Sequence, residues 1–229
     1  MNLLALDTST EFCSCAVWRS GDILWRGELA GQRHSDILLL MIDGLLSDAG
    51  LALKQLDGIA FGAGPGSFTG IRIACSVVQG LALGADLPVV PVCTLEALAE
   101  LSGSERVVAA LDARLDEIYV AYYRRDGDVW QAVFAPVLCS ISDAPALGES
   151  GWAGVGSGFS ILDGALVHHF GLNLASVNGA LHPEATAIAR LGANALAMGK
   201  GRDAAEAQPI YLRNKVALTI EERSERKRA

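Results

Sequence analysis

The chain has 229 residues, of which 51% are hydrophobic and 19% charged, a composition that excludes intrinsic disorder and allows a core without metals or disulfides. The net charge of −8 argues against binding of tRNA or DNA by this chain alone, because such binding needs a positive stripe whose counterion release supplies most of the affinity. The only basic cluster, Arg223–Arg228, lies in a tail of mixed charge, and we expect residues 219–229 to be flexible. Contact with nucleic acid through a partner stays open.

Hydrophobic periodicity predicts strands and helices in the order βββαβαβα over the first half of the chain. Gly50 ends the first helix as a C-cap glycine, and a glycine-rich turn connects the buried fourth strand to the second helix. The predicted elements are strands Asn2–Leu6, Cys13–Trp18 and Asp22–Leu29, helix Ser35–Asp48, strand Gly58–Gly62, helix Thr69–Leu83, strand Pro88–Val92 and a helix from Thr94.

The second half begins with the same pattern, at a constant offset of 105 residues and without a gap. The matches are Ala5-Leu6-Asp7 with Ala110-Leu111-Asp112, Glu11 with Asp116, Ala16 with Ala121, Leu24 with Val129 and Trp25 with Trp130. We therefore expect an α/β protein made of two ribonuclease H-like units, the actin-like ATPase architecture, with domains at residues 1–104 and 105–229. The alternative is that two similar hairpins resemble each other by chance. Further on, the pattern predicts a loop at Pro136–Ser150, a strand at Trp152–Val155 and a closing helix at Pro183–Met198.

Two such domains face each other across a cleft, and the turn after each first strand projects into it. In an active phosphotransferase the aspartate of such a turn holds Mg²⁺ through water, and hydroxyls and glycine-loop amides hold phosphates. The alternatives are equally open: the turn residues satisfy their own amides, Gly62–Gly70 is a tight turn, and Ser67 is a helix N-cap. The chain has no Gly-Lys-Ser/Thr of a Walker A loop. The candidate vestigial phosphate-site residues are Asp7, Thr8, Ser9, Gly64, Gly66, Ser67 and Asp112.

The two helices beside the glycine-rich turn are more apolar than a surface helix requires, because one stripe is enough to cover a sheet. A fully buried core helix is one explanation. The other, which we favour, is that a second protein covers their outer faces. The predicted interface residues are Ile37, Leu38, Met41, Ile42, Leu45, Ile71, Ala74, Val78 and Leu81.

Sequence motifs for catalysis or metal binding are missing. The four histidines include no pair at i, i+4, and the five cysteines form no CxxC pair, so we predict no metal site and plain core thiols. The first residues lack a signal peptide's basic segment, and the longest apolar run, Ile37–Ile42, is far shorter than the roughly 18 residues of a membrane span. These features predict a cytoplasmic protein with no membrane partner.

Several motifs together resemble the TsaB (YeaZ) family across essentially the whole chain. They are LLALDTST, RHSDILLLMIDGLL, GIAFGAGPGSFTGIRIA, LDARLDEIYVA and PIYLR at Pro209–Arg213. The resemblance implies a role in making threonylcarbamoyl adenosine at position 37 of tRNAs that read ANN codons. It implies a non-catalytic scaffold that binds the catalytic paralogue TsaD and works with the ATPase TsaE, and that reaches tRNA only through the complex. It also implies no cofactor of its own, ATP and Mg²⁺ used by the complex, and a homodimer through the same helices when alone.

The catalytic paralogue carries a His-Met-Glu-Gly-His metal motif where this chain has Thr94-Leu95-Glu96-Ala97-Leu98. Thr94 and Leu98 therefore stand at the two histidine positions, and leucine cannot bind a metal. A stand-alone ATPase or small-molecule kinase using Asp7, Thr8 and Asp112 is the alternative function.

Overall fold

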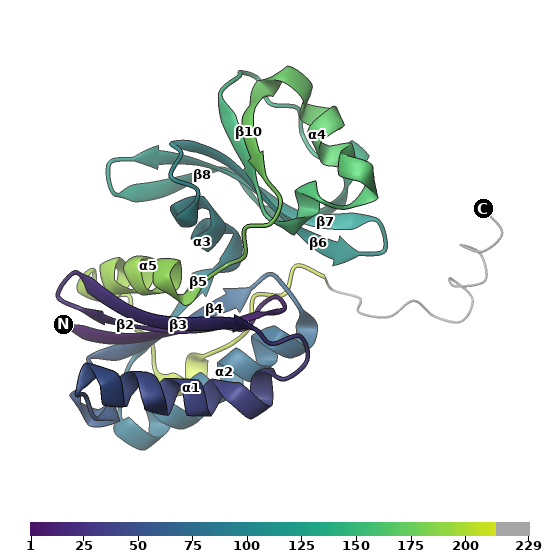
Figure 1. Cartoon of the computed structure of the whole chain (residues 1–229). Helices are drawn as coiled ribbons and strands as arrows, with labels where there is room; N and C mark the ends of the chain where they lie inside the picture. Colours follow the sequence, from purple (N-terminus) through teal and green to yellow (C-terminus); the bar gives the residue numbers. More distant parts are fainter. Residues whose placement is uncertain (214–229) are drawn as a thin grey trace.

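The computed structural model describes residues 1–213, so the tail predicted at 219–229 lies outside the described residues. Two five-stranded sheets form two lobes (Figure 1). The first sheet has the order β3-β2-β1-β4-β5 and the second β10-β9-β6-β7-β8. In each sheet three antiparallel strands come first and two parallel ones follow, which confirms the duplicated α/β fold of the actin-like ATPase architecture. The strands are β1 Asn2–Asp7, β2 Phe12–Arg19, β3 Asp22–Leu29, β4 Gly58–Gly64, β5 Val89–Cys93, β6 Arg106–Arg114, β7 Glu117–Asp126, β8 Val129–Ser140, β9 Trp152–Val155 and β10 Leu174–Asn178.

Alternating side chains of β1 explain how helices cover both faces of the first sheet. Leu4 and Leu6 pack with α1 (His34–Ala49) and α2 (Phe68–Ala85) on one face. Leu3 and Ala5 pack with α5 (Ala185–Ala197) on the other face (Figure 1). The remaining helices are α3 Thr94–Leu101, α4 Ala165–Phe170 and the short 3₁₀ turns η1 Leu53–Gln55, η2 Ile141–Asp143, η3 Ser157–Phe159, η4 Leu162–Gly164, η5 Gly171–Asn173 and η6 Ala204–Glu206.

A sequence signal marks one end of each long helix of the first lobe: α1 ends and α2 begins within one residue of the predicted positions. Gly50 caps α1 in the left-handed conformation, with φ of 64°. Ser67 caps α2, and its side-chain oxygen accepts a hydrogen bond from the Gly70 amide at 3.4 Å. Among the described helices, α2 alone is long and apolar enough to cross a membrane by length and composition. It packs on β4 as part of the first lobe's core.

The two lobes exchange helices, which corrects the predicted domain limits. Leu95 and Leu98 of α3, from the first half of the chain, lie in the core of the second sheet. Helix α5, from the second half, covers the first sheet, and Ala204 and Ala207 add to the core beneath α1 and α2. A cut near residue 104 therefore does not separate two independent cores.

The repeat is real but its predicted register is wrong by one residue. Asp7 pairs with Ser14, seven positions on, whereas Asp112 pairs with Ile118, six positions on. In the third strand the mismatch is larger. Trp25 pairs with Ala16, whereas Trp130 pairs with Arg125 and not with Val120, the counterpart of Ala16. In keeping with this, Trp130 is buried and Trp25 is 46% exposed. The loop predicted from Pro136 is also wrong up to Ser140, because β8 continues to that residue. Proline is tolerated there because β8 is an edge strand.

Candidate functional site

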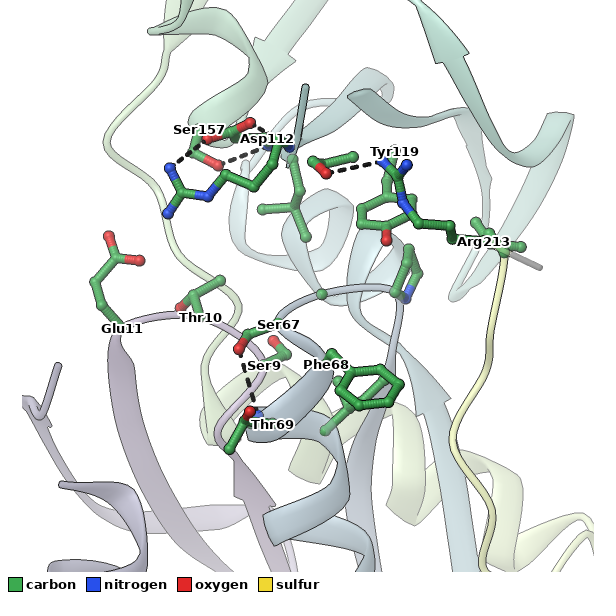
Figure 2. A pocket seen from close by; sticks show the side chains of 18 of the residues that line it. Ser9, Thr10, Glu11, Ser67, Phe68, Thr69, Asp112, Tyr119, Ser157 and Arg213 are labelled. Carbon is green, nitrogen blue, oxygen red and sulfur yellow. Dashed lines mark hydrogen bonds and ion pairs between the residues drawn. The ribbon is translucent and has the colours of Figure 1, made fainter. Parts of the chain in front are cut away.

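A cleft of about 960 Å³ separates the two lobes (Figure 2). The turn after β1 and the start of α2 form its lower wall, and the β6–β7 turn and η3 form its upper wall. Residues 210–213 complete the lining. Of the predicted phosphate-site residues, Ser9, Gly66, Ser67 and Asp112 line this cleft.

Asp7 does not line the cleft, which contradicts its predicted role as a Mg²⁺ ligand there. Its side chain is fully buried, and its Oδ1 accepts hydrogen bonds from the Ser9 amide at 3.0 Å and the Ser9 hydroxyl at 2.8 Å. Its Oδ2 has no partner among the described residues and lies where a side chain at Gly62 would be. Burial raises the Asp7 pKa from 3.8 to about 7. The carboxyl group organises its own turn and faces inward.

The glycine-rich turn packs directly on the turn that follows β1. A side chain at Gly66 would overlap the Ser9 carbonyl, and one at Gly70 would overlap the Thr8 carbonyl. The Ser67 amide donates to the Ser9 carbonyl at 2.7 Å, and the buried Thr8 hydroxyl donates to the Gly70 carbonyl at 2.7 Å. Gly66 and Gly70 therefore allow two backbone segments to touch, and the Ser67 amide already has an acceptor. Thr8 is buried outside the cleft, so its predicted contact with phosphate is wrong.

Gly64 also lies outside the cleft lining and has a local structural explanation. Its φ is 113°, a backbone conformation that residues with a side chain rarely adopt. A Cβ atom at this position would also lie close to the Ile210 carbonyl oxygen. The conformation and this close approach account for glycine at position 64, and its predicted role at a phosphate stays a prediction.

Asp112 lies on the upper wall of the cleft and is already paired. Its Oδ2 is 3.0 Å from the Arg114 guanidinium, and its Oδ1 accepts from the Arg114 amide at 2.7 Å. The Asp112 amide donates to the Ser157 hydroxyl at 3.1 Å, which ties the turn to η3. Asp112 thus closes its own turn, as Asp7 does in the first lobe.

Thr94 and Leu98 are buried and have packing roles. The Thr94 hydroxyl donates to the Pro65 carbonyl, so α3 begins against the glycine-rich turn. Leu98 is fully buried in the second lobe's core and approaches Gly156 closely. Within residues 1–213, no group of three or more His, Cys, Asp and Glu side chains is placed to hold a metal ion.

Residues 210–213 connect the two lobes along the cleft. The Ile210 amide donates to the Ala63 carbonyl at 2.7 Å in the first lobe. Three residues later, the Arg213 guanidinium donates to the Ala113 carbonyl at 2.9 Å and pairs with Glu117 at 2.8 Å in the second lobe. In Figure 2, Arg213 lies beside Tyr119 of the upper wall. This connecting role is not predicted from the sequence, where the segment stands out only by its PIYLR motif.

The outer faces of α1 and α2 form a second candidate site, and here most of the predicted interface residues are wrong. Six of the nine point inward and pack in the core of the first lobe. These are Leu38, Ile42, Leu45, Ile71, Ala74 and Val78, each at most 3% exposed. Ile37, Met41 and Leu81 are half-buried at the edge of that core. The side chains available to a partner are therefore largely others.

The exposed large apolar side chains of α1 and α2 are Leu39, Leu40, Phe68 and Leu83, which are 51%, 74%, 39% and 66% exposed. On α2, Ser76, Gly80 and Gly84 are exposed and follow one another at four-residue spacing, so they share one face of the helix. No described atom lies within 4 Å of a side chain placed at Gly80 or Gly84. A groove of about 460 Å³ begins beside this stripe, between Ser35 and the first turns of α2. Continuing the helical period outward from the buried positions would have identified this face.

Fold and site together define a duplicated ribonuclease H-like protein in which Asp7, Thr94 and Leu98 are buried. The family model described as TsaD, tRNA N6-adenosine threonylcarbamoyltransferase, matches residues 27–212. The chain is 38% identical to the tRNA threonylcarbamoyladenosine biosynthesis protein TsaB of Escherichia coli, over 95% of this chain and 96% of that protein. It is 40% identical to the protein of the same name from Haemophilus influenzae, over 94% and 95%. The solved structure of YeaZ from Pseudomonas aeruginosa has a TM-score of 0.85 at 38% identity and covers 92% of this chain and 99% of its own. The chain belongs to the TsaB (YeaZ) family.

Proposed function

We propose that this chain is a non-catalytic subunit for the threonylcarbamoyl modification of adenosine 37 in ANN-decoding tRNAs. It holds the catalytic TsaD-like paralogue through the outer faces of α1 and α2. A TsaE-like ATPase joins this pair, tRNA is reached only through the complex, and ATP and Mg²⁺ belong to the complex. A cytoplasmic location and self-association of the isolated chain through the same faces complete the proposal.

The observation that carries the proposal is the contrast between the two candidate sites. In the cleft, Asp7 is buried, Asp112 is paired with Arg114, and Leu98 fills a core position. On α1 and α2, leucines are exposed, and α2 carries a stripe of small residues with open space above Gly80 and Gly84. Small residues let a second helix approach closely, and an exposed apolar patch marks an interaction site. A partner covering this face fits a standard interface of about 1,600 Å².

The experiment is reconstitution of the modification with the purified transferase, the ATPase, tRNA, ATP, threonine, bicarbonate as the source of the carbamoyl carbonyl, and the enzyme that makes the activated threonylcarbamoyl donor, with and without this chain. We expect modified adenosine only when the chain is present, and a transferase complex by calorimetry. The matched variants are Leu40→Asp on the exposed face and Leu172→Asp, which changes a 99% exposed leucine of the second lobe. Loss of complex in the first and not in the second supports the proposal. Full modification without the chain, or equal binding by both variants, contradicts it.

The stand-alone ATPase or kinase is tested on the isolated chain. Because Asp7 faces inward, Asp112 is the carboxylate to change. The alternative function predicts micromolar ATP–Mg²⁺ affinity that Asp112→Asn weakens, together with measurable ATP turnover. Our proposal predicts no turnover by the isolated chain.

A further inference from the structure

Arg72 is an exposed arginine on α2 that its neighbours hold in one orientation. Its guanidinium carbon lies 3.7 Å from the centre of the Phe68 ring and 5.6 Å from that of Tyr211. Its Nε donates a hydrogen bond to the Tyr211 hydroxyl at 2.7 Å. Stacking on an aromatic ring and one fixed donor remove much of the freedom of this long side chain.

The backbone holds Tyr211 in place. The neighbouring Ile210 amide bonds to Ala63 at the end of β4, and Arg213 is tied to the second lobe. The Tyr211 and Phe68 rings lie 6.0 Å apart. The guanidinium is therefore fixed before any partner arrives, and a fixed donor loses less entropy on binding.

The charge of Arg72 is not compensated within residues 1–213. Every ion pair of this region joins other residues, and no described carboxylate lies within 4.0 Å of this guanidinium. The only acceptor assigned to it there is a phenol, which is neutral and occupies Nε. The two terminal nitrogens keep the fork geometry that matches two oxygens of one anion.

The surroundings decide which anion fits. Arg72 lines the groove of about 460 Å³ together with apolar and hydroxyl side chains. Among residues 1–213, Arg72 is the only cation that lines the groove, whereas a phosphate site would favour a second. One guanidinium among apolar walls suits a single carboxylate beside apolar side chains. The groove's lining includes Ser76, so it continues into the small-residue stripe of α2. Its lining residues are Ser35, Phe68, Thr69, Arg72, Ile73, Ser76 and Val77.

We propose that Arg72 is the anchor for an Asp or Glu side chain on the helix of the partner that covers α1 and α2. This inference rests on the proposed function and adds the chemistry by which the partner is recognised. When the partner seats, the carboxylate bonds to the terminal nitrogens of Arg72 and the pair loses contact with water. Truncating one member of such a pair is costly because it leaves the other buried and unpaired.

The test is calorimetry of the full chain with the TsaD-like transferase at several salt concentrations. Arg72→Gln keeps a polar side chain and removes the charge, and we expect binding at least about 30-fold weaker with a smaller salt dependence. Arg72→Lys keeps the charge but not the forked geometry of the guanidinium, so we expect its affinity to lie between those of the unchanged chain and Arg72→Gln. Tyr211→Phe removes only the positioning bond, so we expect about 3- to 10-fold weaker binding with the salt dependence kept. The matched control is Arg190→Gln, an exposed arginine of α5 on the other face of the first sheet, expected to bind as the unchanged chain does.

The outcomes separate this inference from the proposed function. If the unchanged chain binds and Leu40→Asp abolishes binding while Arg72→Gln stays within threefold, the interface stands and the Arg72 inference is overturned. If the unchanged chain does not bind the transferase, both fail. A third outcome concerns a double variant, Glu221→Gln with Glu222→Gln. If it loses as much affinity for the transferase as Arg72→Gln does, and adding Arg72→Gln to it weakens binding no further, the carboxylate belongs to this chain and the inference is overturned.

Discussion

Gly80 offers the sharpest separation of stability from binding. It is exposed in the interior of α2, and a side chain built there meets no described atom within 4 Å. Gly80→Leu therefore adds a large apolar group without a clash inside the chain. It also places that group on the face that we propose a partner helix approaches.

The two effects have opposite signs. Replacing a helix-interior glycine by leucine favours the helix by about 0.8 kcal/mol, which for a chain of this size raises Tm by roughly 2–3 °C. At a close helix–helix contact, the same side chain overpacks the interface at a cost of about 1–3 kcal/mol, which corresponds to about 5- to 150-fold weaker binding. A chain that becomes more stable and binds less well is the expected result.

The assay pairs thermal unfolding of the isolated chain with calorimetry against the transferase. Gly80→Ala, which adds one methyl group, should give the same gain in stability with a smaller loss of affinity. Asn194→Leu places a leucine at an exposed position of α5 and should leave binding unchanged. Unchanged affinity of Gly80→Leu would refute a close approach at this stripe, and a lower Tm would refute our description of Gly80 as an open helix position.

Three further predictions concern the cleft and residues 210–213, which connect the two lobes along it. The Asp7 pKa is about 7 in the folded chain against an ordinary 3.8, so the folded state binds the proton more tightly and stability is lost as pH rises from 4 to 7. In urea unfolding at several pH values, the unfolding free energy of the unchanged chain relative to that of Asp7→Asn should fall by up to about 4 kcal/mol as the pH rises from 4 to 7. A difference that does not change with pH would refute this prediction. Gly62→Ala should lower the unfolding free energy by about 1–3 kcal/mol, because the methyl group displaces the Asp7 carboxyl from Ser9; an unchanged Tm would contradict this. Arg213→Gln should lower the unfolding free energy by about 1–3 kcal/mol and speed amide exchange near Glu117. Equal exchange rates would show that residues 210–213 do not stabilise the second lobe.

Element order could be predicted from the sequence because strand and helix periods are local. The predicted ends of α1 and α2 are close to the observed ones because Gly50 and Ser67 act within a few residues of the chain. The side of each helix that faces the sheet could not be predicted, because apolar residues surround α1 and only the sheet decides which are buried. Leu38 is therefore core and Leu39 surface, although both are leucine.

The candidate site was predicted less well for a related reason. The cleft residues Ser9, Ser67 and Asp112 follow from the repeated first strand and the glycine-rich turn. That Asp7 faces inward depends on Gly62, a contact between residues far apart in sequence. The one-residue slip between the repeats depends on turn length, which a gapless comparison cannot detect.

The exchange of α3 and α5 between the lobes constrains how the chain matures on the ribosome. The last strand of the first sheet, β5, ends at Cys93, but its covering helix α5 begins at Ala185. At translation rates of about 5–20 residues per second, one apolar face of that sheet waits roughly 5–20 s for its cover. During this interval Leu3, Ala60 and Val90, all at most 2% exposed in the finished fold, have no helix over them. The core of the first sheet is therefore completed only after α5 has been synthesised, and until then the nascent chain exposes an apolar face of the kind that promotes aggregation.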